Sequence, residues 1–256
     1  MQQSFPKNLH VHTTSTKEEA CELLTQALNT TLKKAFDDKT PFLLLVSGGS
    51  AFDLFPHIDV KNFSSASTVG VLDERFSTDP SVNNMEQFKK TNFYTALQDK
   101  KVESIDTTVA HGETMEQLAV RFDQELWNWK KNNSEGIIVA TVGIGPDGHT
   151  SGVLPFPENP SLFTELFENP DTLVVSYDAD GKNPYRYRAT TTNTFLRNYL
   201  DHAFVYAVGA NKKDALVKVG LDSGDLPATP ARILREMKDV HLFTDVSLEE
   251  NNSPQQ

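Results

Sequence analysis

The most reactive combination of side chains in the sequence lies at positions 143–150, which read Gly-Ile-Gly-Pro-Asp-Gly-His-Thr. His149 is the best acid–base candidate, because an imidazole exchanges its proton close to neutral pH. Asp147 supplies a carboxylate that can orient the ring, and the glycines let a ligand approach the backbone closely. A histidine in a glycine loop can also be a structural hydrogen-bonding group, so both interpretations stay open.

The same loop matches the letters of the dinucleotide-binding fingerprint G-x-G-x-x-G. That fingerprint must open a helix that carries the pyrophosphate, and Pro146 with the prolines at 155 and 157 disfavours such a helix. The loop also follows a strand that is not the first of the chain. We therefore predict a loop that brings Asp147 and His149 to a pocket, and no dinucleotide site.

Four further segments carry groups that can bind an anion. Residues 47–50 read Ser-Gly-Gly-Ser, and backbone N–H groups in such a turn can cradle a phosphate, although the letters also suit a plain tight turn. Arg75 follows Asp73 and Glu74. Its guanidinium group can bind an anionic group in a bidentate manner, or it can form a salt bridge in a solvated turn. Arg188 and Lys212 are the other cations able to neutralise a phosphate, and each alone also suits a surface charge.

The elements that must position these residues alternate between strand and helix. Apolar runs predict strands at residues 42–46, 68–72, 136–142, 173–177, 187–191, 203–208 and 240–243. Helical periodicity appears behind a capping box at Thr16 and Glu19, and at residues 85–97, 113–131, 211–219 and 230–237, whereas the proline-rich stretch 155–170 predicts an irregular loop. We expect an α/β fold: a Rossmann-like, mostly parallel sheet with helices on both faces, as a single domain over residues 1–248 followed by a polar tail, 249–256.

Four of the polar clusters directly follow predicted strands. In an open parallel sheet, ligands bind outside the carboxyl ends of the strands. The turns after residues 46, 72, 142 and 208 are therefore predicted to converge on one edge of the sheet. This convergence points to an active site more strongly than any single motif does.

Composition narrows the function classes. The 256 residues include 24 Lys and Arg against 35 Asp and Glu, a formal net charge of −11, which argues against a nucleic-acid partner. The single cysteine, Cys21, excludes an internal disulfide framework. We find no signal peptide and no apolar run long enough for a membrane span, so we expect a cytoplasmic protein without a membrane partner. His10 and His12 alternate near the N-terminus, but we expect no metal site there.

Taken together, the clusters resemble the 6-phosphogluconolactonase family, within the larger group that includes glucosamine-6-phosphate deaminase. The segment from Gly143 to Pro155 is similar to the lactonase signature G-x-G-x-D-G-H-T-A-S-L-F-P, with Gly152 and Val153 in place of Ser-Leu. Residues 73–84 look like D-E-R-x-V-P-x-x-x-x-S-N, with Ser77 and Thr78 in place of Val-Pro. The turn at 47–50 matches S-G-G-S/T but continues with Ala51 and Phe52 rather than Thr-Pro. Residues 188–190 resemble R-x-T and residues 209–212 resemble G-x-x-K.

The resemblance implies a hydrolase that converts 6-phospho-D-glucono-1,5-lactone to 6-phosphogluconate, a step of the oxidative pentose phosphate pathway. The catalytic group would be His149 as general base, with Asp147, Asp73 and Arg75. The sugar phosphate would be bound by Ser47, Gly48, Gly49, Ser50, Arg188 and Lys212. No metal and no organic cofactor are expected, and the protein would be a monomer or a small homo-oligomer. The alternatives are a deaminase/isomerase acting on an amino-sugar phosphate, although this chain lacks the glutamate of the deaminase sequence H-I-A-F-N-E-P, and a non-catalytic sugar-phosphate-binding relative.

Overall fold

A seven-stranded parallel sheet forms the centre of the computed structural model, which describes residues 4–248. The strand order is β1-β10-β9-β6-β2-β3-β5. The predicted polar tail, 249–256, lies outside the described residues. The strands are β1 (Leu9–Thr13), β2 (Phe42–Val46), β3 (Ser67–Val71), β5 (Glu103–Ser104), β6 (Ile137–Gly143), β9 (His202–Tyr206) and β10 (Val240–Thr244).

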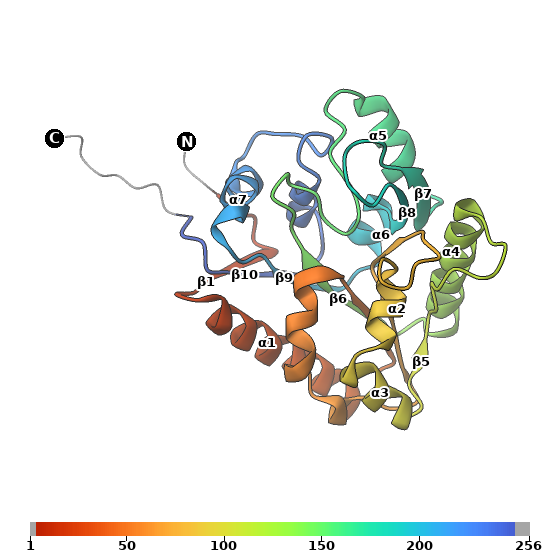
Figure 1. The fold of residues 1–256 in the computed structure, drawn as a ribbon. Coiled ribbons are helices and arrows are strands. Elements are labelled where there is room, and N and C mark those ends of the chain that lie inside the picture. The colour runs from red at the N-terminus through yellow and green to blue at the C-terminus, as the bar shows by residue number, and fades with distance from the viewer. Residues whose placement is uncertain (1–3, 249–256) are drawn as a thin grey trace.

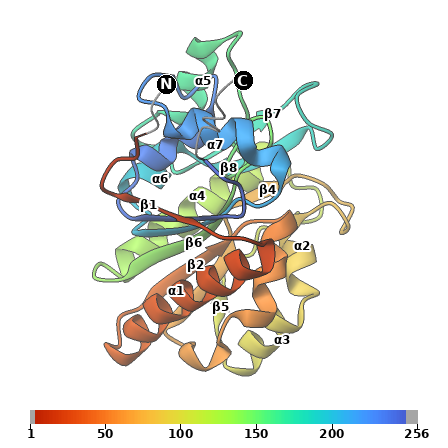
Figure 2. The same cartoon turned by 90° about the vertical axis from the view of Figure 1, so that its left-hand side faces the viewer.

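Successive side chains of a strand point to opposite faces, and here both faces are covered. The side chains of Leu43 and Leu45 on β2 belong to the apolar core on one face of the sheet, and those of Phe42, Leu44 and Val46 belong to the core on the other face. The result is a three-layer sandwich, in which the red and yellow helices lie below the sheet and the green and blue ones above it (Figure 2). The helices are α1 (Lys17–Asp37), α2 (Asn84–Lys89), α3 (Asn92–Asp99), α4 (Met115–Asn132), α5 (Pro160–Phe167), α6 (Asn193–Asn198) and α7 (Lys213–Gly220), with 3₁₀ turns η1 (Gly49–His57), η2 (Val60–Asn62), η3 (Ala210–Lys212) and η4 (Pro230–Arg235).

A second, antiparallel sheet stands beside the first and was not expected from the sequence. Its order is β4-β8-β7, from strands β4 (Asp73–Arg75), β7 (Val174–Asp178) and β8 (Tyr187–Thr191). Residues 73–75 are therefore a strand and not a solvated turn, and Glu74 is fully buried. Figure 1 shows β7 and β8 beside α5 and α6, away from β1.

Three further differences have local causes. The helix predicted at 85–97 is two helices, because the Thr91 side chain caps a new start by accepting from the Tyr94 N–H. The proline-rich stretch holds a short helix, α5, because Asn159 caps it and Pro160 occupies its first turn, where proline is tolerated. Strand β1 was missed, and it pairs in parallel with β10 along its whole length.

None of the described helices is both long enough and apolar enough to cross a membrane.

Candidate active site

One cavity of about 240 Å³ collects the polar clusters at the carboxyl ends of four adjacent strands, β9, β6, β2 and β3. The chain order reverses between β2 and β6, and such a switch point is where open α/β sheets bind ligands. Nine of the ten predicted site residues line the cavity, and the tenth, Asp147, is in hydrogen-bond contact with the His149 ring. The full lining is Ser47, Gly48, Gly49, Ser50, Asp73, Arg75, Asn84, Gly143, Ile144, Gly145, Pro146, His149, Ser151, Gly152, Asn183, Tyr185, Arg188 and Lys212.

His149 and Asp147 form a closely coupled pair. The ring Nδ1 lies 2.6 Å from Asp147 Oδ1, and the same oxygen accepts the His149 backbone N–H at 3.2 Å. Burial alone would raise the pKa of Asp147, but the hydrogen bonds and charge of His149 outweigh it, and the pKa lies below its usual value. An ionised carboxylate can only accept, so Nδ1 carries a proton, and in the neutral ring Nε2 then keeps a free lone pair.

The close turn of this loop depends on Gly145. A Cβ atom at that position would lie 2.0 Å from His149 Nδ1, so any side chain would push the ring away. The Gly145 N–H also donates to the His149 carbonyl at 2.8 Å, which closes the loop. The glycines therefore place the histidine. Short bridges join Ile144 to Thr150 and Thr150 to Val153, and in the described part of the chain the next helix begins only at Pro160, so no helix starts at the loop to carry a pyrophosphate.

Arg188 enters the cavity from the second sheet and is held on three sides. Its Nη1 pairs with Asp73 Oδ2 at 3.4 Å, its Nη2 donates to Asn183 Oδ1 at 3.0 Å, and its Nε donates to the Tyr185 carbonyl at 3.2 Å. The Arg188 side chain is only 5 % exposed. It is thus a preorganised buried cation and not the surface charge that its sequence alone also allowed.

Arg75 lies beside it on β4, in register with Arg188 on β8. Its guanidinium carbon stacks 4.0 Å from the centre of the Tyr185 ring. Three buried atoms that have no hydrogen-bond partner among the described residues belong to the cavity lining: Arg75 Nε, Asn84 Oδ1 and Ser151 Oγ. Buried polar groups normally have partners, so this group of orphaned atoms is what a polar ligand would satisfy.

Lys212 and the 47–50 turn close the other side of the cavity. Burial lowers the pKa of Lys212, and the negative charge of Asp147 opposes that shift. The Ser47 hydroxyl donates to the Thr141 carbonyl at 2.8 Å and so fixes β2 to β6. The turn leads into the 3₁₀ helix η1, whose first N–H groups have no partner within the helix.

Sequence reasoning assigned no role to several residues of this site. Asn84, Asn183, Tyr185 and Ser151 line the cavity, and only Asn84 had a signal, as the last letter of the motif at 73–84. Glu74 lies beneath the site. It accepts from the N–H groups of Arg75, Asn84 and Met85 and from the Thr107 hydroxyl, and burial raises its pKa to about 7 against the effect of these bonds.

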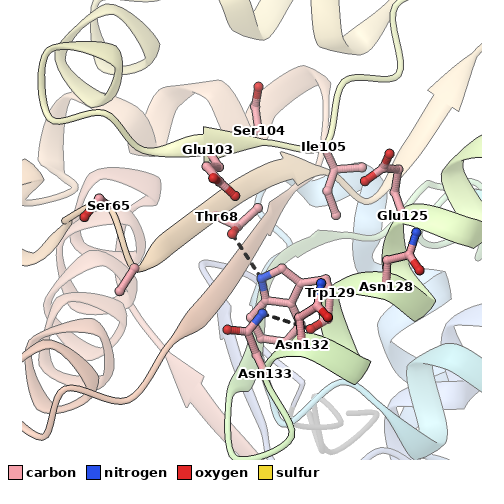
Figure 3. Close-up of a pocket in the computed structure, with 11 residues that line it drawn as sticks. Ser65, Thr68, Glu103, Ser104, Ile105, Glu125, Asn128, Trp129, Asn132 and Asn133 are labelled. Atoms are coloured by element: carbon pink, nitrogen blue, oxygen red, sulfur yellow. Dashed lines mark hydrogen bonds between the residues drawn. The ribbon is translucent and has the colours of Figure 1, made fainter.

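A second cavity, of about 330 Å³, lies near the start of β3 and the end of α4 (Figure 3). The indole N–H of Trp129 donates there to the Thr68 hydroxyl at 3.0 Å. Among its described lining residues, the ionisable side chains are Glu103 and Glu125. None of these lining residues carries a positive charge that could bind an anion. The charge of the first cavity makes it the better candidate site.

A family model described as glucosamine-6-phosphate isomerases/6-phosphogluconolactonase matches residues 15–242. The chain belongs to this family. The expected membership is thereby confirmed, and the matched segment includes all the predicted site residues. A comparison with curated proteins gave no match.

Solved structures show that the family fold extends over nearly the whole chain. The 6-phosphogluconolactonase of Leishmania guyanensis is 21 % identical, with 95 % of this chain and 98 % of that chain covered and a TM-score of 0.73. The enzyme of Trypanosoma cruzi is 16 % identical, with 98 % and 100 % covered and a TM-score of 0.75. A 6-phosphogluconolactonase from Shewanella baltica is 21 % identical, with 94 % and 98 % covered and a TM-score of 0.70. At such identities the likeness confirms the predicted α/β fold.

Gly152, one of the departures from the lactonase signature, has a structural reason in this chain. Its φ is +77°, and a Cβ atom there would lie 2.5 Å from Thr190 Oγ1 and 2.6 Å from Asp73 Cβ. Glycine at this position lets β8 and Asp73 approach the segment that follows His149 closely. Glycine at position 152 therefore allows the segment after His149 to pack directly against β4 and β8 of the second sheet.

Proposed function

We propose that this protein hydrolyses a sugar-phosphate lactone, 6-phospho-D-glucono-1,5-lactone, to the open acid 6-phosphogluconate. The observation that carries the proposal is the shared cavity, in which an oriented imidazole, His149, faces the same space as three cations, Arg75, Arg188 and Lys212. Relatives of the same fold are named 6-phosphogluconolactonases. The proposed reaction needs a base that activates water and cations that bind a phosphate. His149 would be the base, and Arg188 and Lys212 would bind the phosphate.

His149 is the general base of the proposed reaction. Because Asp147 accepts the Nδ1 proton, Nε2 is free to take a proton from water as the water oxygen attacks the lactone carbonyl. The carbonyl becomes a tetrahedral oxyanion, which Arg75 or loop N–H groups stabilise. When the C–O bond to the ring oxygen breaks, His149 returns its proton to that oxygen, and the products are a carboxylic acid and a hydroxyl group.

The phosphate is assigned to Arg188, Lys212 and the turn at 47–50. Arg188 is fixed by Asp73 and its neighbours before any ligand arrives, so little side-chain entropy is lost on binding. Lys212 is half-buried, and burial disfavours its charged form. A bound phosphate dianion would favour that charged form by direct electrostatic attraction. Asp73 is a positioning residue here, because it acts on the substrate through Arg188.

The amino-sugar-phosphate deaminase is disfavoured by position 154. The deaminase sequence has a glutamate five residues after the histidine, and this chain has Leu154. Leu154 is fully buried in the apolar cluster of Phe156, Phe163 and Phe167. An acid–base side chain is thus missing where ring opening and isomerisation would use one.

A lactonase assay with the spontaneous hydrolysis rate subtracted tests the proposal. We expect the purified protein to accelerate hydrolysis of the phosphorylated lactone and to release no ammonia from glucosamine 6-phosphate. Thermal stabilisation by the product without any turnover would instead indicate a non-catalytic sugar-phosphate-binding protein. Ammonia release would identify the deaminase.

A further inference from the structure

Four histidines and one aspartate gather at the opposite end of the sheet from the proposed active site. His10 and His12 lie on β1, His241 on β10, His202 begins β9, and Asp239 immediately precedes β10. The pairing register sets His10 beside His241, and the rings of His10 and His241 stack with centroids 4.9 Å apart. The sequence showed only the alternation of two histidines; the parallel pairing of β1 with β10 assembles the rest.

We propose that His10, Asp239 and His241 bind a zinc ion. One ligand atom from each of the three residues lies within 4.8 Å of the others. Asp239 Oδ1 is 3.5 Å from His10 Nε2 and 3.5 Å from His241 Nε2. A tetrahedral zinc with bonds of about 2.0–2.2 Å separates its ligand atoms by about 3.3–3.6 Å, so two edges of the tetrahedron are already in place. The third edge closes by rotation of the His10 ring, which is 50 % exposed.

The surrounding groups leave the correct atoms free to bind the metal. His241 Nδ1 lies 3.3 Å from His12 Nε2, so a hydrogen bond between them can hold the Nδ1 proton and present Nε2 as a lone pair. The second oxygen of Asp239, Oδ2, pairs with His202 Nδ1 at 2.7 Å, which fixes the carboxylate plane. Such outer partners orient the ligands in zinc sites and raise their affinity for the metal.

Ligand type and access also suit a divalent cation. One carboxylate oxygen and two imidazole nitrogens are a ligand set that zinc commonly takes in proteins. Asp239 and His202 are each 32 % exposed, so the cluster opens to solvent and water can complete the coordination. A zinc ion held here would fasten the edge strand β1 to β10. It would not reach the proposed active site, because β9 runs its full length between His202 and the cavity end of the sheet.

Equilibrium dialysis of the metal-free full chain against micromolar zinc tests this proposal. We expect the wild type to bind one zinc ion per chain in a saturable way. His10→Ala and His241→Ala should each bind zinc at least about tenfold more weakly. The matched control is His111→Ala, an exposed loop histidine outside the cluster, which should bind zinc like the wild type. His149→Ala should also keep the affinity, which separates this site from the imidazole of the active site. Zinc should raise the Tm of the wild type and leave that of His10→Ala unchanged.

Absence of saturable binding, or equal affinity in the wild type and both ligand variants, overturns the proposal. His10 is half-exposed on an edge strand, so its variant should fold even if His241→Ala does not. Lactone turnover should be the same in His10→Ala as in the wild type, with or without a chelator. Failure of the zinc site would therefore leave the proposed lactonase function standing, and the reverse also holds.

Discussion

At the scale of single residues, the carboxylate of Asp147 decides what the imidazole of His149 can do. It pairs with Nδ1 of the ring, and His149 lines the same cavity as Arg75, Arg188 and Lys212. The protein as a whole is acidic, with a net charge of −11, yet these cations gather in one cavity. A local cationic seat in an acidic protein selects small anions without attracting polyanions.

Lys212→Ala tests the phosphate seat. Loss of one charge-assisted contact should raise KM for the phosphorylated lactone about tenfold or more and change kcat little, because the contact is made equally in ground state and transition state. The matched control is Lys213→Ala, the exposed neighbouring lysine, which should leave KM unchanged. An unaltered KM in Lys212→Ala, with preference for the phosphorylated lactone retained, would show that the phosphate binds elsewhere.

The sequence predicted the charged residues of the site and the turn at 47–50, and missed Asn183, Tyr185 and Ser151. His149, Arg75, Arg188 and Lys212 follow strands or lie within motifs, so their meeting could be inferred from the chain alone. Asn183 and Tyr185 lie in a loop before β8, and their place depends on the second sheet, which the sequence pattern did not reveal. Ser151 likewise depends on the turn after His149, where its φ is +50°.

At the scale of elements, Glu74 joins β4 to the start of α2. It accepts from the N–H groups of Asn84 and Met85 at 2.6 and 2.9 Å, and from the Thr107 hydroxyl at 2.7 Å. These bonds keep Asn84 against the cavity, where a side chain at Gly48 would collide with it. A buried carboxyl group that was predicted to lie in a turn therefore organises one wall of the site.

Because of the Glu74 carboxyl, we expect the unfolding free energy to depend on pH. Its pKa is about 7 in the folded chain and near 4.5 when unfolded, so between these values the folded chain holds a proton that the unfolded chain has released. The stability contributed by this group is therefore fully present below pH 4.5 and is lost as pH rises through 7. Relative to Glu74→Gln, which cannot titrate, the wild type should lose up to about 3 kcal/mol of unfolding free energy over this range.

Urea unfolding of both proteins at several pH values measures that difference. Glu116→Gln, which removes an exposed carboxylate from the first turn of α4, serves as the control and should follow the wild-type curve. A difference between wild type and Glu74→Gln that does not change with pH would contradict the raised pKa.

The close packing of Gly152 against Asp73 and Thr190 leads to a second prediction for the elements of the fold. Gly152→Ala adds strain at φ +77° and a clash with Asp73 and Thr190, and should lower the unfolding free energy by about 2–4 kcal/mol. Gly112→Ala has the same type of backbone, at φ +76°, with no atom within 4 Å of the new Cβ, and should cost only about 1–2 kcal/mol. Displacement of Asp73 should also raise KM through Arg188. An equal loss of unfolding free energy in the two variants would show that position 152 does not lie close to Asp73 and Thr190.

At the scale of the whole molecule, the alternation of strands and helices was enough to predict the main sheet and the meeting of its loops. Apolar runs such as residues 42–46 identify buried parallel strands by composition. Strand β1 was missed because its alternating histidines hide the strand pattern, and β4 because Asp73, Glu74 and Arg75 are charged residues that normally lie in turns. Strand β1 pairs with β10 and strand β4 pairs with β8, and both partners lie far along the chain. A local sequence pattern does not indicate such long-range pairing.

The site draws residues from both sheets, so ligand binding should stabilise the chain as a unit. We expect a single calorimetric transition, as predicted for one domain. Saturating 6-phosphogluconate, at about 100 times its Kd, should raise the Tm by roughly 5–10 °C. Two separate transitions, or a shift of only part of the signal, would show that the sheets unfold independently and that the cavity does not join them.

The kcat of His149→Ala for the phosphorylated lactone, corrected for spontaneous hydrolysis, tests the central claim most directly. The control is His57→Ala, an exposed histidine at the end of η1. We predict that kcat falls about 10²–10⁴-fold in His149→Ala, while the variant still binds 6-phosphogluconate and the control keeps wild-type turnover. A His149→Ala protein with near-normal kcat and an unchanged pH profile would contradict the account.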